Sequence, residues 1–151
     1  MGYDGHGLEV LDRDECLRLL ASVPVGRLGL SVDALPVIVP VNFAVDGDRL
    51  VIGTGEGSKL DAAMAGSVVC LETDRWDPMG HDGWSVLVQG TTSIVDDPDD
   101  VARCRALPLR PWGRPEALRY ITVGIDLVSG RRLRRPGGAS WSVAPPVSAA
   151  C

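Results

Sequence analysis

A β-hairpin between residues 36 and 54 constrains the fold of this chain more than any other sequence feature. Residues 36–45 form an apolar, β-branched run, Asp46-Gly47-Asp48 is a turn signal, and residues 49–54 form a second apolar run. Two runs joined by so short a turn pair as antiparallel strands. A parallel pair would need a crossover of a dozen or more residues. The sequence therefore predicts antiparallel β-structure here and excludes a βαβ unit.

The rest of the chain alternates strand patterns with short helical patterns. Residues 67–73 form an unbroken apolar run, which predicts a strand buried on both faces. Residues 75–83 are predicted to form a loop, and Ser129-Gly130 a turn. The predicted fold is mainly β, an antiparallel split-barrel type with peripheral helices. Further strands are predicted at residues 26–32, 84–95 and 120–128, and helices at residues 12–22, 59–65 and 97–107.

The chain of 151 residues fits one domain. Residues 1–9 are glycine-rich and are predicted to be a flexible N-terminus, followed by the barrel domain at residues 10–135. Residues 136–151 are mostly Pro, Gly, Ala and Ser, which predicts a weakly ordered C-terminal arm. Several strands are apolar on both faces, so the barrel needs a second buried surface. A homodimer interface would supply it.

Charge and hydropathy exclude several classes of partner. The net charge of −5 argues against a nucleic-acid partner, although Arg131-Arg132 and Arg134-Arg135 form a local basic cluster. We expect these pairs to cap a strand or to contact a partner subunit. No apolar stretch reaches membrane-spanning length and no signal-peptide pattern is present, so we expect no membrane contact and a cytoplasmic protein.

The cysteines and histidines do not predict a metal or hydrolytic site. Cys16, Cys70, Cys104 and Cys151 are widely spaced, and we interpret Cys16 and Cys70 as buried free thiols. Nothing fixes a nucleophile, a base and an oxyanion donor together in the group around His81, so we name no catalytic residue. The other members of that group are Asp77, Asp82 and Ser85.

A glycine-rich run follows the hairpin and ends in the single lysine of the chain, Lys59. It reads Gly-Thr-Gly-Glu-Gly-Ser-Lys over residues 53–59, between a strand and a helix with Ser58 as its expected N-cap. Backbone N–H groups at such a place bind anions, and a compact ammonium suits phosphate. The order of Ser58 and Lys59 excludes a Walker A loop. The alternative is a glycine-rich hairpin loop with a solvated lysine.

Over residues 8–135 the order of motifs resembles the flavin-binding split-barrel superfamily, the pyridoxamine 5′-phosphate oxidase-like proteins. An early helix and the strand with Gly26-Arg27-Leu28-Gly29 precede Pro40-Val41-Asn42-Phe43. The hairpin then leads into the glycine-rich run. A later strand carries Gly83-Trp84-Ser85-Val86 followed by Gln89-Gly90.

The resemblance implies a cofactor site at a homodimer interface, with FMN as the cofactor we favour. The strand with Pro40, Val41 and Asn42 would lie beside the isoalloxazine ring. The 5′-phosphate would bind at the glycine-rich run, which includes Gly55, through Thr54, Ser58 and Lys59. Trp84, Ser85 and Gln89 would approach from the partner subunit.

The chain departs from the true pyridoxamine 5′-phosphate oxidases, because it lacks their Arg-x-His element near the C-terminus. Its histidines are His6 and His81, and its tail has only Ser140-Trp141-Ser142. We therefore expect an FMN-dependent oxidoreductase that acts on another small molecule. The alternatives are FAD, a deazaflavin coenzyme in a reductase, or haem with His81 as a ligand. A non-enzymatic protein that binds or senses flavin or haem also remains open.

Overall fold

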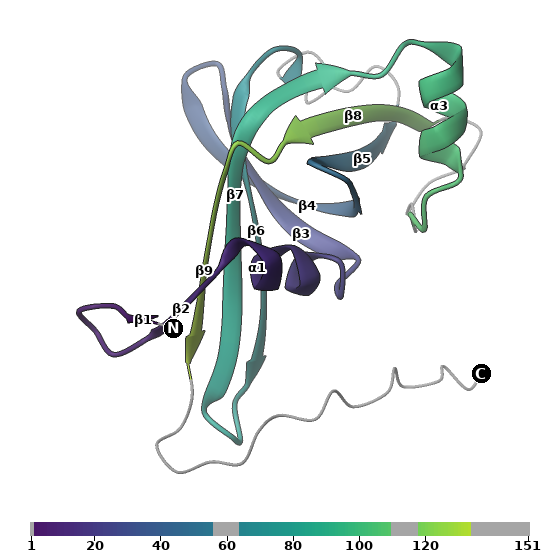
Figure 1. The fold of residues 1–151 in the computed structure, drawn as a ribbon. Helices are drawn as coiled ribbons and strands as arrows, with labels where there is room; N and C mark the ends of the chain where they lie inside the picture. The colour runs from purple at the N-terminus through teal and green to yellow at the C-terminus, as the bar shows by residue number, and fades with distance from the viewer. Residues whose placement is uncertain (1, 56–63, 110–117, 134–151) are drawn as a thin grey trace, which may run out of the picture.

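The computed structural model describes residues 2–55, 64–109 and 118–133. Antiparallel strands dominate this part of the chain (Figure 1). In chain order the elements are β1 (Gly2–Tyr3), β2 (Glu9–Leu11), α1 (Arg13–Leu20), β3 (Val25–Val32), β4 (Leu35–Asp46), β5 (Arg49–Gly55), β6 (Val68–Asp77), β7 (Asp82–Ile94), α3 (Pro98–Arg105), β8 (Leu118–Gly124) and β9 (Leu127–Leu133).

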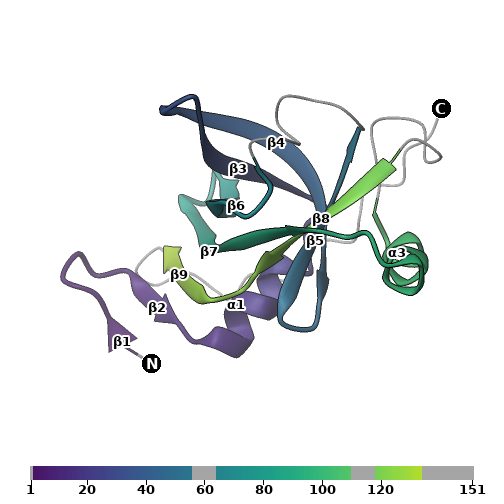
Figure 2. The same cartoon turned by 90° about the horizontal axis from the view of Figure 1, so that it is seen from above.

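The strands form one sheet that closes on itself. Their order is β1-β2-β9-β7-β6-β3-β4-β5-β8, and an additional pairing of β7 with β8 completes a barrel. β9, β2 and β1 extend the sheet beyond this closed ring on the side of β7, as Figures 1 and 2 show. The predicted split-barrel fold of mainly β type is confirmed.

The barrel closes because β7 changes partners along its length. Its first half pairs with β9 up to Gln89–Leu127, and its end pairs with β8 from Thr92–Val123. Gly90 lies between these two pairings, where a Cβ atom would overlap the carbonyl oxygen of Gly124. The absence of a side chain at Gly90 lets the two strands approach at this corner.

The main core fills the barrel interior and extends under α1. Asp12 caps α1 by accepting a hydrogen bond from the Glu15 backbone N–H at 2.8 Å, as its sequence predicts. Cys16, Leu19 and Leu20 are the buried residues of this helix. They join a cluster formed by inward residues of the strands, including Leu28, Phe43, Leu50, Ile52, Leu71, Val86, Val88 and Ile121.

A smaller core joins α3 to the barrel. Cys104 of α3 packs with Val51 of β5, Tyr120 of β8 and Val95. Asp97 caps α3 by accepting a hydrogen bond from the Asp100 backbone N–H at 3.0 Å. The predicted helices at residues 12–22 and 97–107 are confirmed with slightly shorter bounds. Most of the helix predicted at residues 59–65 lies outside the described residues.

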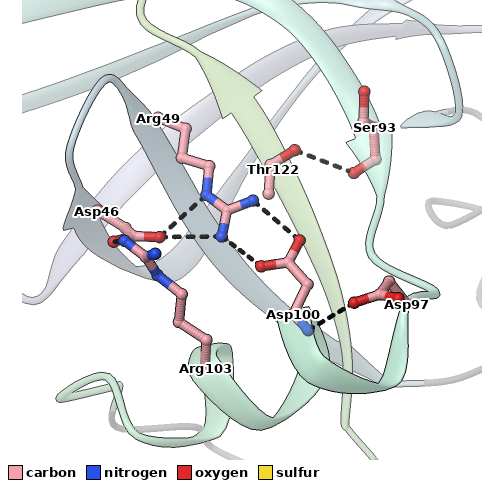
Figure 3. Close-up of polar contacts among 7 residues, drawn as sticks. All are labelled: Asp46, Arg49, Ser93, Asp97, Asp100, Arg103 and Thr122. Atoms are coloured by element: carbon pink, nitrogen blue, oxygen red, sulfur yellow. Dashed lines mark hydrogen bonds and ion pairs between the residues drawn. The ribbon is translucent and has the colours of Figure 1, made fainter.

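Ion pairs attach α3 to the turn of the β4–β5 hairpin (Figure 3). The guanidinium of Arg49 donates to both carboxylate oxygens of Asp100, at 2.6 and 3.0 Å, and to Asp46 at 3.0 Å. Arg103 of α3 donates to Asp46 at 2.8 Å. We call these four residues the α3 clamp. The neighbouring guanidinium groups, Arg103 first, hold the pKa of Asp46 below its ordinary value.

The sequence predicted a flexible segment at residues 1–9 and no strand there. The structure has the short strands β1 and β2 in this region. Residues 2–3 and 9–11 pair in the order β1-β2-β9. Charges hold this corner together, because Arg131 binds Asp4 at 3.0 Å and Arg132 binds Glu15 at 2.5 Å. Hydrogen bonds from Arg18 and then Arg132 lower the pKa of Glu15 to about 2. The described arginines of the basic cluster therefore have partners within the chain.

Two loop predictions were wrong. Residues 75–83 instead continue β6 and β7 as a long hairpin, with pairs down to Asp77–Asp82. The predicted turn at Ser129-Gly130 is part of β9, which pairs with β7 through Val86–Gly130. Gly130 is required for packing rather than for turning, because a Cβ atom there would lie 2.7 Å from the Cys16 sulfur.

Residues 67–73 were predicted to form a strand buried on both faces, but in the structure only one face of this strand is buried. β6 alternates between buried and accessible residues, so only one of its faces is covered by the chain itself. Val69 and Leu71 are buried in the core, whereas Val68 is 77% exposed and Cys70 is half-buried. Cys16 is a buried free thiol as predicted, and Cys70 is a free thiol near the surface. The open face of β6 is part of the candidate site described next.

Candidate functional site

The candidate site begins where β4 and β5 separate. They pair from Asp46–Arg49 to Phe43–Ile52, and the pairing ends there. Towards its N-terminus β4 pairs with β3 instead, whereas β5 continues along β8 as far as Gly55–Leu118. Among the described residues, no strand pairs with residues 53–55 on the side of β4. We call this opening the split.

The split brings together two segments that the sequence analysis assigned to the cofactor. Extending the register beyond Phe43–Ile52 would place Val41 opposite Thr54, and Pro40 opposite Gly55. Pro40, Val41 and Asn42 therefore lie on one side of the split, and Thr54 and Gly55 on the other. The hairpin brings these residues opposite one another, and the divergence of its two strands leaves an opening between them.

Asn42 is a buried polar residue at the split. The residue as a whole is 5% exposed, and no hydrogen bond of its side-chain amide is found within the described part of the chain. Its amide atoms are not among the fully buried polar atoms that lack a partner there, so the amide opens to the surface at the split, where a ligand can replace its water. Its neighbours Val41 and Phe43 point into the core, so the Asn42 side chain is on the opposite face of β4.

The backbone at Asn42 also directs a donor towards the split. The Phe43 N–H donates to the Pro24 carbonyl oxygen at 3.1 Å, on the β3 side of β4. Successive N–H groups of a strand point to opposite sides. The Asn42 N–H is therefore directed to the β5 side, where the pairing with β5 has ended. A ligand in the split would meet a backbone donor and a side-chain amide from one residue.

The far side of the split is formed by β5 and β8. The Thr54 hydroxyl lies 3.5 Å from the Arg119 carbonyl oxygen, to which it donates, and Gly55 has no atom within 4 Å of the place where a Cβ would lie. Gly53 has only ordinary contacts with Leu118 around that position. Neither Gly53 nor Gly55 has a positive φ. The fold itself therefore does not require glycine at these positions, and a close approach by a ligand would explain them.

Two of the three β7 residues of the predicted site, Ser85 and Gln89, lie on the outer face of the barrel. Val86 and Val88 are buried, so the alternating residues Ser85 and Gln89 face outward, where Ser85 is half-buried and Gln89 exposed. Trp84 points the other way and packs against the main core. The structure thus places Ser85 and Gln89 on a surface available to a ligand, and Trp84 on the opposite face of β7.

Ser85 and Gln89 are not close to the split of the same chain. β3 and β6 lie between β4 and β7, so three inter-strand steps separate the two regions. At about 4.8 Å a step, this is on the order of 14 Å. One ligand group cannot make hydrogen bonds to Pro40 or Asn42 and to β7 of the same chain. The remaining predicted residues, Ser58 and Lys59, lie outside the described residues.

The outer face also carries large apolar side chains. Ile38, Gly29, Cys70, Gln89 and Leu127 form one cross-strand row by register. Ile38 and Leu127, at its two ends, are 74% and 65% exposed. Val68 of the same face of β6 is 77% exposed. Exposed apolar side chains gathered on one face of a sheet are typical of an interaction surface.

A charged group lies in the next row of this face. Arg27 donates to Glu72 at 3.0 Å and to Asp74 at 3.3 Å. Partial burial, and then the charge of Asp74, raise the pKa of Glu72. The contact of Arg27 with two acidic residues of β6 depends on the β3–β6 register, which local sequence does not indicate.

The group around His81 lies at and beside the end of the β6–β7 hairpin. His81 is exposed at the end of the β6–β7 hairpin, with a φ of 53°. Within residues 2–55, 64–109 and 118–133 there is no cluster of three or more His, Cys, Asp or Glu side chains that could hold a metal ion. The same residues contain no helix long and apolar enough to cross a membrane.

Comparison with solved structures shows the same architecture in two bacterial proteins. A structure described as the FAD binding protein from Mycobacterium smegmatis is 35% identical, has a TM-score of 0.76, and is matched over 84% of this chain and 99% of that chain. A structure described as an FAD-binding protein from Mesorhizobium loti, 22% identical, shares the fold with a TM-score of 0.66 over 83% of this chain and 96% of its own.

Sequence comparison places the similarity over the same region. An uncharacterized protein of Mycobacterium tuberculosis is 41% identical over 128 residues, which cover 82% of this chain and 84% of the relative. The family model described as pyridoxamine 5′-phosphate oxidase matches residues 12–132, from the cap of α1 into β9. With its closed antiparallel barrel, its split and this match, the chain belongs to the pyridoxamine 5′-phosphate oxidase family.

Proposed function

We propose that this chain binds a flavin at the split and uses it, as a homodimer, in oxidoreductase chemistry on a small molecule. The observation that carries the proposal is Asn42, a residue only 5% exposed whose amide opens to the split and makes no hydrogen bond within the described chain. A ligand with both donors and acceptors would satisfy this amide. The pyrimidine ring of a flavin has both kinds of group.

The residues at the split fit both the polar ring and the 5′-phosphate of a flavin. Asn42 offers an amide and a backbone N–H to a polar ring, and the apolar surface of Pro40 lies beside it. Thr54 and Gly55 border the open edge of β5, where hydroxyl and backbone donors suit a phosphate. Ser58 and Lys59 follow in the sequence and would add a second hydroxyl and a positive charge. A bound flavin would supply hydride or electron transfer, and the chain would orient it and exclude water.

A second copy of the chain would complete the site. Ser85 and Gln89 are too far from the split to meet the same ligand group within one chain, but they share the outer face with the exposed Ile38, Val68 and Leu127. Covering this face with a second copy would bury the apolar side chains and would bring Gln89 of the partner subunit towards the ligand. Light scattering of the purified protein should give the mass of a dimer, and a monomer at all concentrations would contradict this part of the proposal.

FMN is the flavin that the sequence favours, because the glycine-rich run has a single lysine. The similar Mycobacterium smegmatis structure is described as an FAD-binding protein, which supports FAD as the alternative. Both flavins contain the same ring and the same 5′-phosphate. The proposed contacts of Asn42, Thr54 and Gly55 therefore apply to either.

The test is titration of the purified protein with FMN, FAD, a deazaflavin coenzyme and haem in turn, followed by absorbance. We expect bound-flavin spectra that bleach with a nicotinamide donor. A Soret band without flavin binding would favour a haem protein, and binding without reduction would favour a non-enzymatic role. Absence of binding by any flavin would contradict the proposal.

Replacing Lys59 tests the phosphate part of the site. Lys59→Ala should weaken flavin binding by about 1–3 kcal/mol if the ammonium pairs with the 5′-phosphate. Lys59→Arg retains the charge and is the matched control. Binding of riboflavin, which has no phosphate, should be unaffected by either substitution. Equal FMN affinity in Lys59→Ala and the unaltered protein would contradict the phosphate assignment.

A further inference from the structure

Arg27 connects the split to two carboxylates on the outer face of the barrel. It is the cross-strand partner of Pro40 on one side and of Glu72 on the other, and cross-strand partners share a face. Its Nη1 donates to Glu72 at 3.0 Å and to Asp74 at 3.3 Å. We call Arg27, Glu72 and Asp74 the outer-face charge group. The group begins next to Pro40, which we assign to the flavin ring, and the proposed function does not use it.

The outer-face charge group carries an excess of negative charge. One guanidinium pairs with two carboxylates, so the group has one negative charge when all three side chains are ionised. The second oxygen of Asp74 accepts a hydrogen bond from the Trp76 indole N–H at 2.9 Å, which adds no charge. Arg131 lies further along the same face, across Ser85 from Asp74, and is itself paired with Asp4.

Water screens these charges only in part. The side chains of Glu72 and Asp74 are 34% and 25% exposed. Burial, and then the charge of Asp74, raise the pKa of Glu72, so the surroundings of this carboxylate already disfavour negative charge. Covering the outer face with a second copy of the chain, as proposed above, would exclude more water and strengthen the field of the group.

The group lies close enough to the proposed ring position to act on a charge there. Glu72 is two inter-strand steps from Pro40, which corresponds to about 10 Å. At this distance and an effective dielectric constant of about 20, a unit charge changes the equilibrium between a neutral and a charged group by roughly tenfold. A flavin ring that takes up two electrons and one proton becomes an anion, so its reduction responds to charges nearby.

We propose that the outer-face charge group lowers the reduction potential of the bound flavin, because Glu72 opposes the negative charge of the reduced ring and Arg27 limits this effect. The inference rests on the proposed flavin site and deepens it by naming residues that tune the ring once it is bound. Substitutions of Glu72 and Arg27 should therefore shift the potential in opposite directions. A merely structural role would not do so, since either substitution breaks the same ion pair.

The experiment measures the dissociation constants of FMN and FAD in their oxidised and chemically reduced forms at pH 8. Their ratio gives the shift of the potential on binding. We expect Glu72→Gln to favour the reduced flavin by about threefold and Arg27→Gln to favour the oxidised flavin by a similar factor, less than the unscreened estimate because the group is partly exposed. A double variant with both substitutions removes one charge of each sign and should resemble the unaltered protein. Asp99→Asn removes an exposed carboxylate from α3 and is the matched control.

The outcomes separate this inference from the proposed function. Thermal unfolding establishes which variants are folded, and Glu72→Gln decides the question alone if Arg27→Gln does not fold. If flavin binds but Glu72→Gln leaves the ratio unchanged or favours the oxidised form, the role of the charge group is overturned while the flavin site stands. Shifts of the same sign in Glu72→Gln and Arg27→Gln also overturn it. If neither flavin binds to the unaltered protein, the proposed function and this inference both fail.

Discussion

The two ends of the β4–β5 hairpin are built in opposite ways. At the turn, Asp46 and Arg49 meet Asp100 and Arg103 in the α3 clamp, where each charge has a partner of opposite sign (Figure 3). At the other end the strands separate, and the amide of the otherwise buried Asn42 opens to the split without a hydrogen bond to the described residues. The same two strands thus end in a closed ionic contact and in an open polar site.

The difference indicates how the roles of stability and binding are divided. A buried polar group with all its hydrogen bonds made inside the chain has nothing left for a ligand, so the α3 clamp is a structural feature. A polar group whose hydrogen bonds are not made inside the chain can exchange its water for a ligand. Substitutions at the turn should therefore change stability, and substitutions at the split should change binding.

The largest stability effect is expected at Arg49. Arg49→Ala leaves Asp46, whose side chain is only 9% exposed, with Arg103 alone and leaves Asp100 without its two hydrogen bonds. We expect a loss of about 2 kcal/mol in the free energy of unfolding, measured with urea. Arg105→Ala on the same helix is the matched control and should change little. A loss as small as that of the control would show that the clamp does not hold α3.

Acid should weaken the turn end of the hairpin and spare the split. The guanidinium groups lower the pKa of Asp46 and Asp100 below the ordinary 3.8, so this stabilisation is present above that pH. It is lost as the pH falls through the lower pKa values of the folded state. The difference in unfolding free energy between the unaltered protein and Arg49→Ala should therefore shrink below pH 3.8. A difference that stays constant down to pH 2 would contradict the ionic account.

The smallest effects are expected from a pair of glycines. Gly47, at the turn, has a φ of 64°, so Gly47→Ala should cost about 1 kcal/mol of stability through backbone strain. Gly55→Ala has neither strain nor a clash in the chain, so its unfolding free energy should be unchanged. If a ligand approaches Gly55 closely, Gly55→Ala should nevertheless weaken flavin binding. If Gly55→Ala lowered the unfolding free energy in urea and Gly47→Ala weakened flavin binding instead, the distinction between the two ends of the hairpin would be contradicted.

The sequence predicted the β4–β5 hairpin itself better than the place where its two strands separate. The hairpin followed from a short turn between two apolar runs, which is a local signal. The split depends on where β4 leaves β5 for β3, and that register is decided by packing of distant strands. Asn42 was assigned through the family resemblance, and the position of its amide at the opening between β4 and β5 became visible only in the folded chain.

Glycine was the residue most often misread. Gly130 was taken as a turn signal, but it lies inside β9 because α1 packs against it through Cys16. The Asp, Gly and Pro residues at 75–83 suggested a loop, yet β6 and β7 continue their pairing through most of this segment. A glycine can be required by a turn, by a close neighbour or by a ligand, and local sequence does not distinguish these causes.

The most direct test of the central claim compares Asn42→Leu with Arg49→Ala in flavin binding. Leu has the same number and branching of side-chain heavy atoms as Asn, although its methyl groups are larger, and it removes the amide without leaving a cavity. We predict that Asn42→Leu keeps or raises the unfolding free energy and weakens flavin binding at least tenfold, whereas folded Arg49→Ala binds flavin within threefold of the unaltered protein. If Asn42→Leu loses stability but binds flavin as tightly as the unaltered protein, the assignment of the split as the binding site would be contradicted.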